Sequence, residues 1–100
     1  MKHSLTISGN HVNVSLDGKI YAHDAGIVRD ELLEVIDRGA TDIRFDLSKL
    51  SYIDSSGLGV LVTVHKRTVE KNGKLVLTGV QGMVAEILKR TRLDKVLHIE

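Results

Sequence analysis

The chain has 100 residues, with 14 Lys and Arg against 13 Asp and Glu, and no cysteine. This near-neutral balance lacks the positive excess of a nucleic-acid-binding or membrane-binding protein, and the absence of thiols excludes disulfides and cysteine-based catalysis. No apolar run approaches the ~18 residues of a membrane span, and no signal peptide is visible. We therefore expect one soluble cytoplasmic domain spanning residues 1–100.

The chain opens with two runs in which apolar and polar residues alternate. Residues 5–8 and 12–16 flank Gly9-Asn10, a pattern typical of an antiparallel β-hairpin, and Asp17-Gly18 is expected to end the second strand. A helical period follows over residues 22–38, with Gly39 at the position of a left-handed cap. Its predicted inward face is Ala25, Val28, Leu32, Val35 and Ile36.

The rest of the chain alternates strands with helices. The pattern predicts strands at 41–47 and 74–78 and a short last strand at 96–99, and residues 50–53 lead out of the first of these. Helices are predicted at 56–71 and 81–90. The order ββαβαβαβ indicates an α/β fold, in which helices pack on a mixed β-sheet that begins with the hairpin.

One segment, residues 52–60, differs from an ordinary strand-to-helix connection. Asp54, Ser55 and Ser56 stand where the second long helix begins, and Asp and Ser are strong N-cap residues. The first turn of a helix also carries partial positive charge and free backbone N–H groups. A phosphate on a serine at this place would be tolerated and would switch the local charge.

The second long helix has two apolar faces. One stripe is expected to pack on the sheet: Leu58, Leu61, Val62, His65 and Val69. The other side carries Gly57, Val60 and Val64, and together with Gly59 it is interpreted as an exposed docking surface for a partner. The alternative is that a loop of the same chain covers Val60 and Val64.

These residues also carry a family resemblance. Asp46-Leu47, then Ile53-Asp54-Ser55-Ser56-Gly57-Leu58-Gly59-Val60-Leu61, then Asn72-Gly73-Lys74-Leu75-Val76-Leu77 resemble the STAS-domain anti-sigma factor antagonists over essentially the whole chain. The resemblance implies a STAS-like fold and a protein that binds an anti-sigma factor serine kinase of the GHKL type, thereby releasing a sigma factor. It also implies phosphorylation by that kinase at Ser55, less favourably at Ser56, and reversal by a serine phosphatase. The implied contact surface is Asp54 with residues 56–60. Together with the helix face described above, this gives the predicted partner-binding residues Asp54, Ser56, Gly57, Gly59, Val60 and Val64.

Other interpretations remain open. The serines could only cap the helix, in which case the chain would be a STAS scaffold module of a larger signalling or transport complex without phospho-switching. A small-molecule-binding domain has only the general habit of α/β folds in its favour. The five histidines lack metal-ligand spacing, and no catalytic set or nucleotide fingerprint is visible, so we expect no enzyme activity, metal or cofactor.

Overall fold

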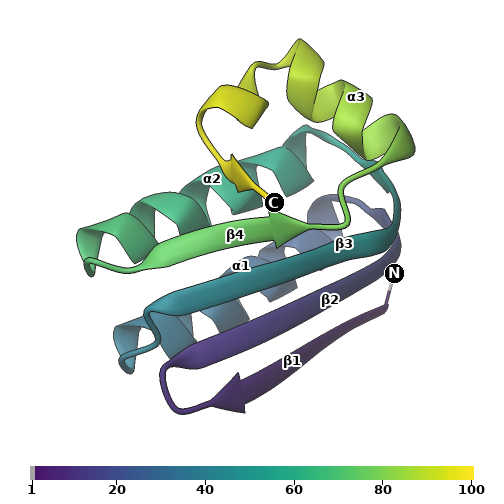
Figure 1. Ribbon diagram of the computed structural model, residues 1–100. Coiled ribbons are helices and arrows are strands. Elements are labelled where there is room, and N and C mark those ends of the chain that lie inside the picture. Colours follow the sequence, from purple (N-terminus) through teal and green to yellow (C-terminus); the bar gives the residue numbers. More distant parts are fainter. Residues whose placement is uncertain (1) are drawn as a thin grey trace.

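The computed structural model describes residues 2–100 and shows a sheet with helices on one of its faces (Figure 1). The elements follow one another as β1 (Lys2–Ser8), β2 (His11–Ile20), α1 (Ala22–Asp37), β3 (Asp42–Ile53), α2 (Ser55–Glu70), β4 (Lys74–Thr78), α3 (Gly82–Arg90), the 3₁₀ turn η1 (Leu93–Lys95) and β5 (His98–Ile99). This order confirms the predicted succession of strands and helices. None of the described helices is long and apolar enough to span a membrane.

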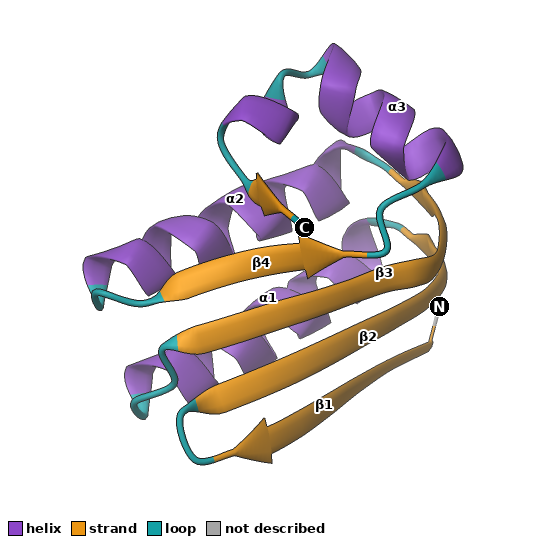
Figure 2. Ribbon diagram, in the orientation of Figure 1, coloured by secondary structure: helices purple, strands orange, loops and turns teal. Residues whose placement is uncertain are grey.

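The strands lie in the sheet in the order β1-β2-β3-β4-β5. β1 and β2 form the predicted antiparallel hairpin, and every later neighbour pair is parallel. Crossovers between parallel strands are right-handed, and here each one moves in the same direction across the sheet. Successive helices therefore fall on the same side, and Figure 2 shows α1 and α2 next to each other behind the strands.

The core lies between this helical layer and the sheet. Alternate residues of the strands point inward, as the period of two requires, and these are Val12, Val14, Leu16, Ile43, Phe45, Leu47, Leu75 and Leu77. From α1 the buried residues are Ala25, Val28, Leu32 and Ile36, while Val35 is only partly buried. The predicted inward face of α1 is therefore confirmed for four of its residues.

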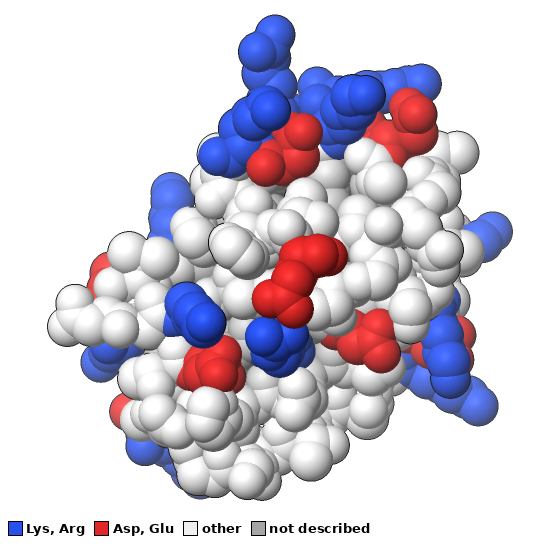
Figure 3. Space-filling model, in the orientation of Figure 1, with Lys and Arg blue, Asp and Glu red and all other residues white. Residues whose placement is uncertain are grey.

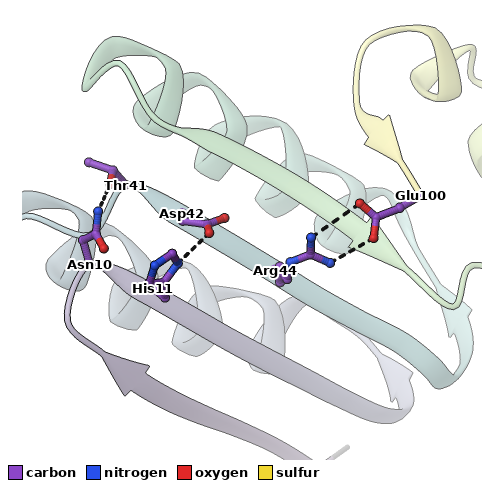
Figure 4. A network of polar contacts seen from close by, with 6 residues as sticks. All are labelled: Asn10, His11, Thr41, Asp42, Arg44 and Glu100. Carbon is purple, nitrogen blue, oxygen red and sulfur yellow. Dashed lines mark hydrogen bonds and ion pairs between the residues drawn. The ribbon is translucent and has the colours of Figure 1, made fainter.

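The opposite face of the sheet carries no helix (Figure 1), and charged residues lie scattered among uncharged ones on it (Figure 3). His11 Nδ1 lies 2.6 Å from Asp42 Oδ2, and Arg44 makes two hydrogen bonds to the Glu100 carboxylate, at 3.0 and 3.4 Å (Figure 4). These pairs connect β2 to β3 and β3 to the residue after β5. Lys and Arg gather instead over α3 and the segment after it, at the top of Figure 3.

The prediction places the start of β1 at residue 5 and that of β5 at residue 96, whereas they begin at Lys2 and His98. Two further strand boundaries, in β2 and β3, are also wrong. β2 does not end at Asp17-Gly18 but continues to Ile20, because irregularities in the pairing with β3 at Ser15/Asp17 and Gly18/Lys19 absorb the turn-forming residues as bulges. β3 runs without interruption from Asp42 to Ile53, so its second half is strand rather than a lead-out. Both extensions carry the ends of β2 and β3 to the same edge of the sheet.

Candidate functional site

The candidate site lies where β2 and β3 end together. Ile20 and Ile53 are register partners, so the chain enters α1 and α2 from adjacent points. The rings of Tyr21 and Tyr52 lie next to this edge, with centroids 5.8 Å apart. The starts of the two helices are thus brought together by the strands that precede them.

Asp54 is the N-cap of α2. Its backbone is extended, with φ −97° and ψ −174°, and its Oδ1 accepts a hydrogen bond of 3.1 Å from the backbone N–H of Gly57. This is the standard arrangement in which a short acidic side chain satisfies one of the free donors of the first turn. The predicted cap is therefore made by the aspartate and not by either serine.

Ser55 is the first residue of α2 and is exposed to solvent. Because Asp54 already supplies the cap, the Ser55 hydroxyl is not required for the helix to begin. It stands at the positive end of the helix dipole, in a first turn without acidic residues. Ser56 is only partly exposed and faces α1.

The glycine that follows the two serines has a packing role. A Cβ added at Gly57 would lie 2.5 Å from Cγ1 of Ile53 and 3.0 Å from Cγ2 of Ile20. The absence of a side chain therefore lets the first turn of α2 lie directly on the ends of β2 and β3. Gly59 is different, because no atom lies within 4 Å of a Cβ placed there.

The expected division of α2 into a sheet face and an exposed face is wrong. Val60 and Val64 are 5% and 0% exposed and belong to the core, as does the buried Gly57. The buried stripe is Gly57, Val60, Leu61, Val64 and Thr68, about 100° from the predicted one. Of the residues that the prediction placed in the core, only Leu61 is buried. The other four are partly or fully exposed: Leu58, Val62, His65 and Val69.

The physical reason is that α2 packs on α1 as well as on the sheet. Contact with two neighbours buries the side of the helix that carries the glycine and the two valines. Thr68 joins this side because its hydroxyl donates a hydrogen bond of 2.7 Å to the Val64 carbonyl oxygen, which removes the cost of burying it. The neighbouring layer is a helix, and not the loop that was the alternative.

A surface groove remains between the first halves of the two helices. We call it the α1–α2 groove; it has a volume of about 310 Å³ and is lined by Ala22, Ala25, Gly26, Arg29, Ser56, Gly59, Val60 and Thr63. Five of these positions carry Gly, Ala or Ser, which keep the groove open. Val60 lines the groove although its side chain is largely buried. Ser55 precedes Ser56, which lies at one end of the groove.

The α1 side of this groove was missed by the sequence analysis. Ala22, the adjacent pair Ala25-Gly26, and Arg29 follow one another at intervals of three to four residues, so they lie on one side of α1. That spacing of small residues was the available signal. The apolar stripe of the helix does not reveal it, because Ala22, Gly26 and Arg29 lie outside that stripe.

The comparisons with known proteins agree with this architecture. The family model of the STAS domain matches residues 3–100. The chain belongs to the STAS domain family. This STAS domain is 31% identical over 90 residues to an anti-sigma-B factor antagonist of Bacillus subtilis, covering 90% of this chain and 82% of the relative.

Further relatives belong to the same group. The chain is 32% identical over 87 residues to an anti-sigma F factor antagonist of Paenibacillus polymyxa, covering 86% of the chain and 74% of the relative. In fold it matches the phosphorylated form of the Bacillus cell fate determinant SpoIIAA with a TM-score of 0.82 and 21% identity, over 99% of this chain and 91% of that one. The unphosphorylated form of SpoIIAA matches with a TM-score of 0.78 and 20% identity, over 95% of this chain and 97% of that one.

These matches confirm the predicted family and the predicted fold. The STAS domain belongs to the anti-sigma factor antagonists, which are regulatory binding proteins rather than enzymes.

Proposed function

We propose that this STAS domain binds a cognate anti-sigma factor through the start of α2 and the α1–α2 groove, and that phosphorylation of Ser55 releases it. The anti-sigma factor would be a serine kinase of the GHKL type, and a serine phosphatase would restore the binding form. The observation that carries the proposal is the exposed Ser55 at the beginning of α2, beside the groove and free of the capping role.

The place of Ser55 explains how one phosphate could switch binding without unfolding the domain. The first turn of α2 offers backbone N–H groups and a favourable dipole to an anion. A phosphate adds about −1.5 to −2 charges beside the Asp54 carboxylate. A partner surface that fits the unphosphorylated start of α2 would then face a concentrated negative charge, and binding would weaken.

The rest of the proposed contact surface follows from burial. Ser56, Gly59 and Thr63 line the groove and are accessible, whereas Gly57 and Val64 are buried and act by holding α2 in place. Asp54 contributes by fixing the first turn. The partner would therefore contact small residues of both helices, with Arg29 as the cation of the groove.

The switch is tested by incubating the domain with ATP and a candidate anti-sigma factor kinase, followed by intact mass and peptide mapping. We expect one phosphate on Ser55. Ser55→Ala should abolish it and keep binding, whereas Ser55→Asp should weaken binding at least tenfold, or by about 1.4 kcal/mol.

Ser56→Ala is the matched control and should still be phosphorylated. A phosphate on Ser56 would overturn the site assignment and leave the switch intact. Equal binding by Ser55→Ala and Ser55→Asp would contradict the switch. Failure to bind any anti-sigma factor would favour a scaffold role in a larger complex.

A further inference from the structure

Two tyrosines stand together where β2 and β3 end. The chain has three aromatic residues, and one of them, Phe45, is buried in the core. The other two are Tyr21 and Tyr52, whose ring centroids lie 5.8 Å apart with the ring planes inclined by 43°. The aromatic side chains that reach the surface are therefore gathered at one place.

The position of Tyr21 goes against local helix preferences. Tyr21 is the N-cap residue of α1, with φ −120° and ψ 177°, and its side chain makes no capping hydrogen bond. A serine, threonine, aspartate or asparagine at this place could satisfy a free backbone N–H of the first turn, as Asp54 does in α2. Such exceptions to local preference are expected at functional sites.

Packing within the domain explains only part of this choice. The contact between Tyr21 and Tyr52 has the separation and tilt of a favourable aromatic pair. Tyr21 nevertheless stays 49% exposed, and it is the only aromatic among the exposed large apolar residues of the part of the chain that the structure describes. About half of a large ring is thus held at the surface, where another molecule can cover it.

The tyrosine pair is continuous with the candidate switch. β2 and β3 end at register partners, so the chain leaves them from adjacent points, towards Tyr21 on one and Ser55 on the other. Ala22, directly after Tyr21, lines the α1–α2 groove together with Ser56. A protein that contacts Ser55 and this groove therefore lies close to the tyrosine rings as well.

We propose that Tyr21 and Tyr52 are the aromatic anchor of the contact with the anti-sigma factor, and that an apolar patch of the anti-sigma factor covers both rings. The inference rests on the proposed function, because it places the same partner over the same end of the sheet. Tyrosine is enriched among the few residues that carry most of the binding free energy of an interface. The small residues of the α1–α2 groove offer little apolar area, and the rings supply it.

The anchor also gives a phosphate on Ser55 a second effect. A phosphate beside an apolar contact must lose water when the partner closes over the rings, and burial of an unpaired charge is unfavourable. Release would therefore follow even from a partner surface that carries no acidic group.

The anchor is tested by measuring the dissociation constant for the candidate anti-sigma factor kinase. Tyr21→Ser removes the ring and supplies a strong N-cap residue, so the new capping hydrogen bond should offset the lost ring contact and keep the variant folded. We expect its dissociation constant to rise at least tenfold. Tyr21→Phe keeps the ring and should recover most of this loss, because the apolar face makes the contact.

Tyr52→Thr tests the second ring independently. Threonine is favourable in strands, so β3 should persist in this variant, and the dissociation constant should again rise. Circular dichroism and urea denaturation check the fold of each variant. A folded Tyr52→Thr variant that binds like the wild type would overturn the pair as the anchor, whatever the fold of Tyr21→Ser.

Val69→Ser is the matched control. Val69 is 53% exposed, close to the 49% of Tyr21, but it lies in the last turn of α2, at the other end of the helix from Ser55. Serine and valine have similar helix propensities, so this variant should be folded and should bind like the wild type. Equal weakening by Val69→Ser and Tyr21→Ser would overturn the anchor, since the loss would not depend on the place of the apolar residue.

The outcomes separate this inference from the proposed function. If the wild type binds the kinase and Tyr21→Ser binds equally well, the anchor is overturned and the proposed function stands. If neither the wild type nor Ser55→Ala binds, the proposed function fails and the anchor fails with it. Self-association of the wild type that Tyr21→Ser abolishes would assign the rings to a second copy of the chain and would also overturn the anchor.

Discussion

At the scale of single residues, Gly57 and Gly59 make opposite demands although both lie in the first turns of α2. Gly57 is in contact with Ile53 and Ile20, whereas Gly59 faces open space. A methyl group at the first position must push the helix away from the ends of the strands. At the second position it only lowers the conformational freedom of the unfolded chain.

Gly57→Ala should therefore lower the free energy of unfolding by about 1–3 kcal/mol, and Gly59→Ala should raise it by about 0.5–1 kcal/mol. Urea denaturation of both variants measures the difference. The two substitutions add the same atoms to the same helix, so each is the control for the other. A similar change of stability for both would contradict the packing assigned to Gly57.

The residue scale also shows where the sequence is ambiguous. Asp54, Ser55 and Ser56 are all good N-cap residues, so composition alone does not decide which of them caps α2. The decision comes from the length of β3, which ends at Ile53 and leaves Asp54 as the first residue outside the strand. The sequence could indicate the place of the switch, and only the end of the strand separates the cap from the free hydroxyl.

At the scale of elements, the start of α2 depends on the Asp54 cap. Asp54→Ala removes the acceptor of the 3.1 Å bond from Gly57 N–H and should lower the free energy of unfolding by about 1 kcal/mol. Asp54→Asn keeps an acceptor oxygen without the charge, and should lose much less. Thermal or urea unfolding of the two variants checks this, and an unchanged stability of Asp54→Ala would show that the cap is dispensable.

The orientation of α2 was the largest error of the sequence-based prediction. Periodicity identified the helix and its two ends within a residue, but the helix offers apolar residues on more than one side. Gly57 contributes nothing to a hydrophobic pattern and Thr68 counts against it, yet both are buried. The correct side is selected by the packing of α1 beside α2, which a pattern within one helix does not contain.

The strands were easier to predict where their pattern is uniform. The run at Lys74–Thr78 became β4 with the expected bounds, since its apolar residues are bounded by turn signals on both sides. Asp17-Gly18 misled the prediction of β2 because the same residues that make turns also make bulges. Local sequence does not distinguish the two until the neighbouring strand is present.

At the scale of the whole molecule, two carboxylates connect stability to pH. Hydrogen bonds from Ser48, first from its side chain and then from its backbone N–H at 3.0 Å, hold the pKa of Asp46 below its ordinary value. The hydrogen bonds and the charge of Arg44 likewise lower the pKa of Glu100. The ionised form of each carboxyl group is therefore more favourable in the folded protein than in the unfolded chain.

A carboxyl group whose pKa is lowered in the folded state stabilises the fold at pH values above its ordinary pKa. This stabilisation is lost as the pH falls through the lowered pKa. These ordinary values are 3.8 for Asp46 and 4.5 for Glu100. The Asp46→Asn/Glu100→Gln double variant should therefore lose less stability than the wild type between about pH 5 and pH 3. The difference should be small because both groups are exposed, and high salt should reduce the share of the Arg44–Glu100 pair. Urea denaturation at the two pH values measures the free energy of unfolding, and an equal loss of it in the wild type and the double variant would contradict this prediction.

The order of the strands in the sheet is the order of the strands in the chain. Each strand therefore joins an edge formed by the strand made just before it, and none has to be inserted between two others. A ribosome releases a chain at roughly 5–20 residues per second, N-terminus first. The nascent chain always has its next docking edge already exposed, so translation and assembly of the sheet can run in the same direction.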